Sequence, residues 1–470
     1  MAEAIIPGRV FKAMQDHLFR GDQEEHGGML MAGVDSSGFG LRLLARAFVP
    51  ARDGIDYVPG ERGYRMLTAD FVQEQILSCR RQRMAYLAVH NHGGEYAVAF
   101  SGDDLASHER GYPALVDIAG GQPVGALVLA RRAVAGDVWL PGGSREDVSR
   151  TRVTGPLLLD LYPRPKPIGP MSEAYSRQAR LFGDAGQARL RDDRVAIVGL
   201  GGVGSLLSEY LARLGVGSIV AIDPDRIDES NLSRVVGASR EDLGEARRPI
   251  VPWSRVSAAT SKVEVARRVA VAANPQVDFS AVPADITEPQ AAALLLGCDF
   301  IFLAADTMQA RLVVNAVVNQ YLIPAAQVGS KVEVNAESGA VGRVFSVYRP
   351  LFPGEGCLKC NGLIDPVQLA LEAETQEQRA AQRYVDEPDL PAPSVITLNA
   401  IGAARAADEF MMRRVGLLEN LGIEWIQVEG RSRTTALVEP RQDANCLYCS
   451  TAADSSLAKG TARSLPTRAG

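Results

Sequence analysis

Apolar positions in the first 140 residues follow two different spacings. Apolar residues at helical spacing predict helices near 8–20 and 67–82 and from about residue 103. Short apolar runs predict strands over residues 28–34, 41–49, 84–92, 123–131 and 137–140. We therefore expect a mixed α/β domain at the N-terminus.

A regular alternation of strand and helix begins near residue 194. The apolar runs predict strands over residues 194–200, 218–223, 277–282 and 299–305. Helical patterns separate them, from residue 203 and near residues 262–273 and 287–296. Alternation of this kind predicts an α/β fold with a predominantly parallel sheet and helices on both faces.

Four prolines separate the two patterns. Because proline fixes φ and removes a backbone donor, Pro163, Pro165, Pro167 and Pro170 predict a stiff connector over 161–173. The predicted domains are therefore 1–160 and 174–452. Small polar residues dominate the end of the chain and predict a flexible tail over 453–470.

Composition narrows the class of protein. The chain has 470 residues, 46% of them hydrophobic, which is enough apolar material for two cores. A formal net charge of -6 argues against nucleic-acid binding, which depends on surplus lysine and arginine. There is no bilayer-length apolar run and no signal-peptide core, so we expect a cytoplasmic protein without a membrane partner.

The stretch "AVHNHGGEYAVAFSGDD" holds candidate metal ligands. His90 and His92 are alternate residues at a strand end, so both side chains can point to one face. Asp104 opens the next helix and can add an oxygen ligand. Two imidazoles and one carboxylate leave a tetrahedral zinc one position for water, whose pKa zinc lowers toward about 7.

Hydrolysis at such a site needs two more groups. A base must take the proton of the water and pass it to the leaving amine, and Glu24 or Glu25 could do so. Ser101 is a candidate hydrogen-bond donor to a transition-state oxyanion. The remaining nearby histidines, His26 and His108, are read as surface or supporting residues.

Glutamate before a strand, His-x-His, serine and aspartate, in that order, resemble the JAMM/MPN (JAB) metalloprotease family. Members are isopeptidases that cut after the C-terminal glycine of ubiquitin-like proteins. The resemblance implies zinc on His90, His92 and Asp104, with Glu25 as general acid/base and Ser101 as oxyanion helper. The chain departs from the family where Gly93 replaces the usual proline.

A glycine-rich turn opens the second domain. Gly199, Gly201 and Gly204 form G-x-G-x-x-G between a predicted strand and helix, with Gly202 inside the motif. Such a turn lets the backbone approach a phosphate at a helix N-terminus. Asp223 ends the next strand, where a ribose hydroxyl would be bound. The motif alone fits NAD or ATP, so a dehydrogenase is an alternative.

Further polar residues favour ATP. A triphosphate needs surrounding cations and an acid for magnesium, neither of which a hydride-transfer site needs. The region from about 172 to 450 resembles the ThiF/MoeB and ubiquitin-activating enzyme family, which adenylates the C-terminal glycine of β-grasp proteins. The resemblance implies that Gly199–Gly204 and Asp223 hold the nucleotide and that Asn231, Arg234 and Lys262 hold its phosphates. It also implies that Asp306 coordinates magnesium. Arg177 resembles an arginine that reaches the ATP of the partner subunit, which implies a homodimer. Residues 245–260 look inserted relative to this family.

The six cysteines fall into two groups, four in C-x-x-C pairs and two outside such pairs. The pairs Cys357/Cys360 and Cys446/Cys449 are both C-x-x-C and predict one structural zinc site with four thiolate ligands, as many ThiF/MoeB relatives carry. Cys298 precedes a buried strand and Cys79 lies in the other domain, so we expect no thioester through a dedicated cysteine.

The two constellations together predict a bifunctional enzyme. One half would adenylate the C-terminal glycine of a ubiquitin-like protein, and the other would cut after that glycine. A conjugating enzyme is a possible further partner. Two alternatives are open: an adenylyltransferase for a sulfur carrier whose N-terminal half only grips the tail, and an NAD-dependent dehydrogenase.

Overall fold

The computed structural model describes residues 2–22, 24–59, 65–244, 258–335, 338–373, 393–418, 420 and 422–468. They form two compact units. Unit 1 comprises Met1–Ile168, Asn319–Leu322 and Ala444–Ser464, and unit 2 comprises Gly169–Val318, Ile323–Asp443 and Leu465–Gly470. The division after Ile168 lies inside the proline-containing segment 161–173. Most of the apparent insertion, residues 245–257, lies outside the described residues.

Unit 1 is built on an eight-stranded sheet with the order β1-β3-β2-β4-β5-β6-β7-β8. Strand β1 also pairs with β7, so the sheet closes on itself. The bounds are β1 Ala2–Pro7, β2 Gly27–Asp35, β3 Leu41–Pro50, β4 Ala85–Asn91, β5 Val124–Leu129, β6 Val134–Trp139, β7 Arg145–Thr154 and β8 Leu158–Leu161.

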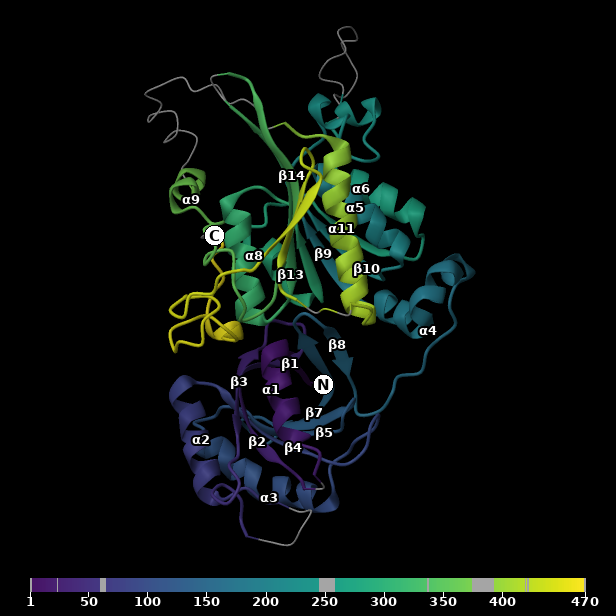
Figure 1. Ribbon diagram of the computed structural model, residues 1–470. Helices are drawn as coiled ribbons and strands as arrows, with labels where there is room; N and C mark the ends of the chain where they lie inside the picture. Colours follow the sequence, from purple (N-terminus) through teal and green to yellow (C-terminus); the bar gives the residue numbers. More distant parts are fainter. Residues whose placement is uncertain are drawn as a thin grey trace. The chain divides into compact units, whose positions relative to one another are not determined.

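Helices cover both faces of this sheet (Figure 1). Helix α1, Gly8–Leu18, contributes Val10 and Met14 to a core with Leu87 and Val89 of β4. Helices α2, Ala69–Gln82, and α3, Gly102–Ile118, pack in a second core that contains Tyr86. Since side chains alternate along a strand, the even-numbered residues of β4 face α2 and α3.

Unit 2 contains a second eight-stranded sheet with the order β11-β10-β9-β12-β13-β14-β15-β16. The five strands from β11 to β13 are parallel, as the strand–helix alternation predicts, whereas β13 to β16 pair antiparallel. The bounds are β9 Arg194–Val198, β10 Ser218–Ile222, β11 Asp278–Val282, β12 Phe300–Leu303, β13 Ala325–Val334, β14 Val341–Leu351, β15 Trp425–Glu429 and β16 Thr434–Val438.

Helices lie on both faces of this sheet, with α5, α6 and α11 on one side and α8 on the other (Figure 1). The bounds are α4 Ser176–Asp192, α5 Gly202–Leu214, α6 Lys262–Ala273, α7 Pro289–Leu294, α8 Met308–Tyr321, α9 Pro366–Ala373 and α11 Ile396–Val415. In the part of the chain described, none of the helices combines the length and apolar character needed to cross a bilayer.

The segment Ala444–Ser464 is an integral part of unit 1. Leu457 and Ala458 are fully buried in a cluster with Ile5, Leu44 and Leu322. The Arg46 guanidinium donates to the carbonyl oxygens of Leu457 and Ala452. The prediction of a flexible tail is therefore wrong for residues 453–464, because two apolar residues within a polar composition are enough to anchor the segment.

Candidate functional site

Three parallel strands of unit 2 bring predicted nucleotide-binding residues to one edge of the sheet. Gly199 follows β9, Asp223 follows β10 and Asp306 lies shortly after β12. Because β9 pairs in parallel with both β10 and β12, the carboxyl ends of all three meet. Ligands of open α/β sheets bind at such an edge.

The glycine-rich turn brings the backbone very close to itself. Gly199 has a φ of 94°, a left-handed conformation that favours glycine. A Cβ on Gly204 would lie 1.8 Å from the Gly199 carbonyl oxygen. At Gly201, which precedes the first residue of α5, a Cβ would meet nothing within 4 Å. The unpaired N–H groups of the first turn of α5 are the groups that would bind an anion here.

The Asp223 carboxylate holds this turn. Its Oδ2 accepts from the backbone N–H of Leu200 at 2.6 Å, and its Oδ1 accepts from that of Asp225 at 2.8 Å. Burial raises the pKa of Asp223, against the nearby charge of Lys262. Each oxygen keeps a second lone pair, so the carboxylate can still accept from a ribose hydroxyl.

Lys262 and Asn231 flank the turn with different chemistry. Lys262 begins α6, and its Nζ lies 2.7 Å from the Asp225 carboxylate. Asn231 is buried and donates through Nδ2 to Asp228 at 2.9 Å, while its Oδ1 has no partner among the described residues. An orphaned acceptor suits a hydroxyl or a cation better than a phosphate oxygen, which differs from the predicted phosphate role.

The remaining predicted residues of unit 2 are more open. The Arg234 carbonyl oxygen lies 3.5 Å from where a Gly202 Cβ would sit, which places this segment against the glycine-rich turn. Asp306 is exposed at the same edge of the sheet. Arg177 is exposed on α4, a helix away from this edge (Figure 1). The structure thus groups the glycines, Asp223, Lys262 and Asp306 but leaves Arg177 apart.

His90, His92 and Asp104 of unit 1 converge as predicted. The two Nε2 atoms lie 3.2 Å apart, and each lies 3.5 Å from Asp104 Oδ2. A tetrahedral ion with bonds of about 2.0–2.1 Å separates its ligand atoms by about 3.4 Å. The three atoms therefore match one face of a zinc tetrahedron, and these residues fit a zinc ion.

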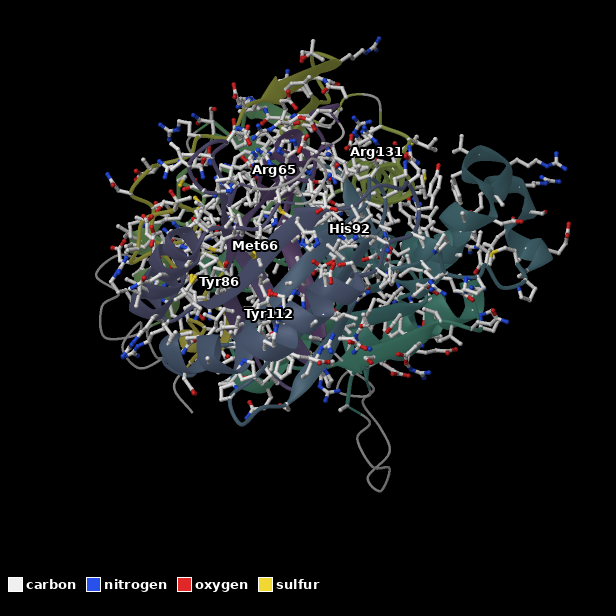
Figure 2. The ribbon with its side chains drawn as sticks, turned by 90° about the horizontal axis from the view of Figure 1, so that it is seen from below. Arg65, Met66, Tyr86, His92, Tyr112 and Arg131 are labelled. Atoms are coloured by element: carbon white, nitrogen blue, oxygen red, sulfur yellow. The ribbon has the colours of Figure 1, made fainter. Side chains whose placement is uncertain are left out.

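The His92 ring is oriented by the backbone (His92 is labelled in Figure 2). Its Nδ1 lies 3.1 Å from the Ala99 carbonyl oxygen, which can only accept. Nδ1 must therefore carry the proton, and the lone pair of Nε2 points toward His90 and Asp104. Such support of the distal nitrogen is typical of metal-ligating histidines.

Glu25 lies beside the three ligands. Its Oε1 is 3.7 Å from His92 Nε2. Burial raises the pKa of the Glu25 carboxyl, and the charges of His92 and His90 work against that shift. A carboxylate whose proton affinity is raised is suited to accept and return a proton.

Ser101 is tied to Asp104. Its hydroxyl donates to Asp104 Oδ2 at 2.7 Å and accepts from the Asp104 N–H at 3.1 Å, which closes a capping box at the start of α3. Burial acts to raise the pKa of Asp104, but hydrogen bonds from His90 and Ser101 hold that pKa well below its usual range. The single Ser101 proton thus orients a ligand, whereas the sequence assigns it to an oxyanion.

Comparison with known proteins bears on unit 2. The model of the ThiF family matches residues 175–420, which is more than half of the chain. The chain belongs to the ThiF family.

Two curated relatives resemble the ThiF-family region. The SAMP-activating enzyme E1 of Haloferax volcanii is 30% identical over 183 residues, covering 38% of this chain and 62% of that protein. The sulfur carrier protein adenylyltransferase of Thermus thermophilus is 32% identical over 188 residues, covering 38% of this chain and 64% of that protein. The chain thus spans less than two thirds of either relative.

A solved structure is also similar. The crystal structure of E. coli MccB is 21% identical, with a TM-score of 0.44, and the match covers 59% of this chain and 72% of that one.

The two cysteines of the C-x-x-C pair in unit 2 lie close together. The Sγ atoms of Cys357 and Cys360 are 3.6 Å apart. Tetrahedral zinc with Zn–S bonds of about 2.3 Å would separate sulfurs by about 3.8 Å. Backbone N–H groups of Asp443 and Tyr448 donate to Cys360 and Cys446. The spacing within the Cys357/Cys360 pair therefore fits two thiolate ligands of one zinc ion.

The two remaining cysteines, Cys79 and Cys298, are both buried. Cys298 is buried, and its thiol lies 3.5 Å from the Leu294 carbonyl oxygen. Burial raises the pKa of Cys79 to about 12, which leaves this thiol protonated at neutral pH.

Three residues of unit 1 have specific hydrogen-bond partners that the sequence does not indicate. His26 and His108 are buried rather than superficial: His26 Nε2 lies 2.9 Å from Asp22, and His108 Nδ1 lies 3.1 Å from Asp137. Asn91, between the two predicted zinc ligands, bonds to the backbone of His26. Its position within His-x-His is the one signal in the sequence that could have singled it out.

Proposed function

We propose that this ThiF-family chain adenylates the C-terminal glycine of a ubiquitin-like β-grasp protein with ATP and magnesium. The convergence of the glycine-rich turn, Asp223, Lys262 and Asp306 at one sheet edge carries this proposal. The relatives support the class of substrate, since one is named a SAMP-activating enzyme E1 and the other a sulfur carrier protein adenylyltransferase.

The residues of unit 2 have separate tasks in this reaction. An oxygen of the glycine carboxylate attacks the α-phosphorus, a new P–O bond forms, and the bond to pyrophosphate breaks. The N-terminus of α5 and Lys262 offset the phosphate charge. Asp306 supplies an oxygen ligand for magnesium, and the orphaned Asn231 Oδ1 accepts from a ribose hydroxyl. Arg177 acts across a homodimer on the nucleotide of the partner.

We further propose that unit 1 cuts the peptide or isopeptide bond after that glycine. The triangle formed by His90, His92 and Asp104 supports zinc binding there. Zinc at such a site polarises a carbonyl and makes a nucleophile of water at neutral pH. Glu25 accepts the water proton and returns it to the leaving amine.

Matched substitutions separate the two activities. Glu25→Gln removes a proton acceptor and is expected to lower cleavage of a C-terminally extended β-grasp protein by about 10²- to 10⁴-fold, with ATP–pyrophosphate exchange unchanged. Asp306→Asn is expected to lower exchange by at least about 100-fold and to spare cleavage. Glu24→Gln, at the neighbouring carboxylate, is the control that spares both.

Two results would count against these proposals. If either substitution abolished both activities in a folded protein, the two sites would not be independent. If wild-type protein showed no exchange but bound nicotinamide cofactor, the dehydrogenase alternative would replace the adenylyltransferase.

Metal analysis gives a separate prediction. Purified protein is expected to hold two zinc ions per chain, one at His90, His92 and Asp104 and one at the two C-x-x-C pairs that the sequence predicts as ligands. His90→Ala should remove one zinc and cleavage together, because two protein ligands hold zinc poorly. Cys446→Ser should remove the other zinc and leave the one at His90 in place. Wild-type protein with zinc only at the cysteines would favour a unit 1 that binds the tail without cutting it.

A further inference from the structure

Asn91 forms the last link between the strand that carries the histidines and the strand that follows Glu25. The regular register of β2 and β4 ends at Gly27 opposite His90. One position further, the Asn91 N–H donates to the His26 carbonyl oxygen at 3.2 Å. In return, the His26 N–H donates to the Asn91 side-chain Oδ1 at 2.6 Å.

This exchange differs from ordinary strand pairing. In a regular antiparallel pair both hydrogen bonds join backbone groups. Here the side-chain amide oxygen of Asn91 takes the place of its backbone carbonyl as the acceptor for the His26 N–H. The two strands therefore stay joined up to the point where Glu25 and His92 leave them.

His26 makes the link rigid. His26 is 2% exposed, and its Nε2 lies 2.9 Å from Asp22 while its Nδ1 lies 3.2 Å from an Arg65 nitrogen. The His26 backbone is thus fixed on one side by these contacts and on the other by Asn91. Glu25 is its immediate neighbour in the chain, and its carboxylate lies 3.7 Å from His92 Nε2.

We propose that Asn91 is a positioning residue for the cleavage reaction. It holds the Glu25 backbone at the distance from His92 at which the carboxylate can exchange a proton with the attacking water. The inference rests on the proposed cleavage function of unit 1. The Asn91 side chain accepts from the His26 backbone and is not one of the three predicted zinc ligands, so its loss should leave zinc binding and substrate affinity in place.

The test compares variants that differ in the acceptor. Asn91→Leu has a similar volume without an acceptor and is expected to lower kcat for cleavage by roughly 10- to 100-fold, as losses of supporting hydrogen bonds at metal sites do. KM, zinc content and ATP–pyrophosphate exchange should match wild type. Asn91→Asp retains an acceptor oxygen and should recover most of kcat. Ser149→Ala, which removes another side-chain bond to backbone in unit 1, is the control.

Hydrogen–deuterium exchange provides a readout that does not depend on activity. The peptide containing His26 should exchange faster in Asn91→Leu than in wild type, and Asn91→Asp should restore its protection. Equal exchange in the leucine variant, an undiminished kcat, a loss of zinc, or failure of the aspartate variant to recover would each overturn the inference. Wild-type protein that holds zinc but does not cleave would instead remove the proposed function, and the inference with it.

Discussion

Gly204→Ala is expected to lower ATP–pyrophosphate exchange by at least about 100-fold, because misplacement by about 1 Å is enough for such a loss. The added Cβ would lie 1.8 Å from the Gly199 carbonyl oxygen, far inside any van der Waals contact. The neighbour is backbone, so no side chain can move aside. Either the turn or the start of α5 must shift, and both present groups to the phosphates.

The matched control is Gly402→Ala, the same substitution within a helix of unit 2. There the new Cβ would meet its nearest atoms at 3.5 Å, an ordinary contact. Because alanine also restricts the unfolded chain, this variant should be as stable as wild type or slightly more so, with exchange unchanged. Nucleotide affinity measured calorimetrically would locate the Gly204 defect; wild-type affinity and exchange in Gly204→Ala would show that the turn tolerates a Cβ.

The grouping of residues at the proposed nucleotide-binding edge has local signals in the sequence. Glycine spacing and the order of strand and helix together place Gly199 and Asp223 at neighbouring strand ends. What Asp223 binds could not be predicted in the same way. One of its backbone donors, Asp225, is two residues further along the chain, but the other, Leu200, reaches it only because β9 and β10 pair in their particular register.

The proposed metal site in unit 1 likewise combines residues with local sequence signals and roles that the sequence does not decide. Strand periodicity alone brings His90 and His92 to one face, and the structure confirms their approach. The hydrogen bond between Ser101 and Asp104 also has a local signal, since serine three residues before an acid resembles a capping box. The Ser101 hydroxyl has one proton, which can be donated either to Asp104 or to an oxyanion. The family resemblance favours donation to an oxyanion.

Strands made by distant pairing were not predicted. Strand β7 has the sequence "REDVSRTRVT", in which charged and polar residues leave no apolar run. It is held by pairing with β6 and with β1, which lies more than a hundred residues earlier. The closing of the unit 1 sheet therefore depends on contacts that no local window of sequence contains.

The segment Ala444–Ser464 is the clearest example of structure that depends on distant contacts. A substitution in this segment is expected to have a large effect on stability. Leu457→Ala is expected to destabilise unit 1 by about 2–5 kcal/mol, the range for truncating a buried leucine. Leu457 is fully buried with Ile5, Leu44 and Leu322, so its removal leaves a cavity against β1 and β3. Leu447→Ala, in the same segment but 51% exposed, should change stability by no more than about 0.5 kcal/mol.

Hydrogen exchange of peptides from β1 and β3, followed with increasing urea, reports the stability of unit 1 alone. Leu457→Ala should lower the urea midpoint for those peptides, whereas Leu447→Ala should not. Equal midpoints would mean that Ala444–Ser464 adds nothing to unit 1. A lowered midpoint has a practical consequence: a fragment ending at residue 168 would lack Leu457 and the carbonyl oxygens that Arg46 binds, so cleavage must be assayed in the full chain.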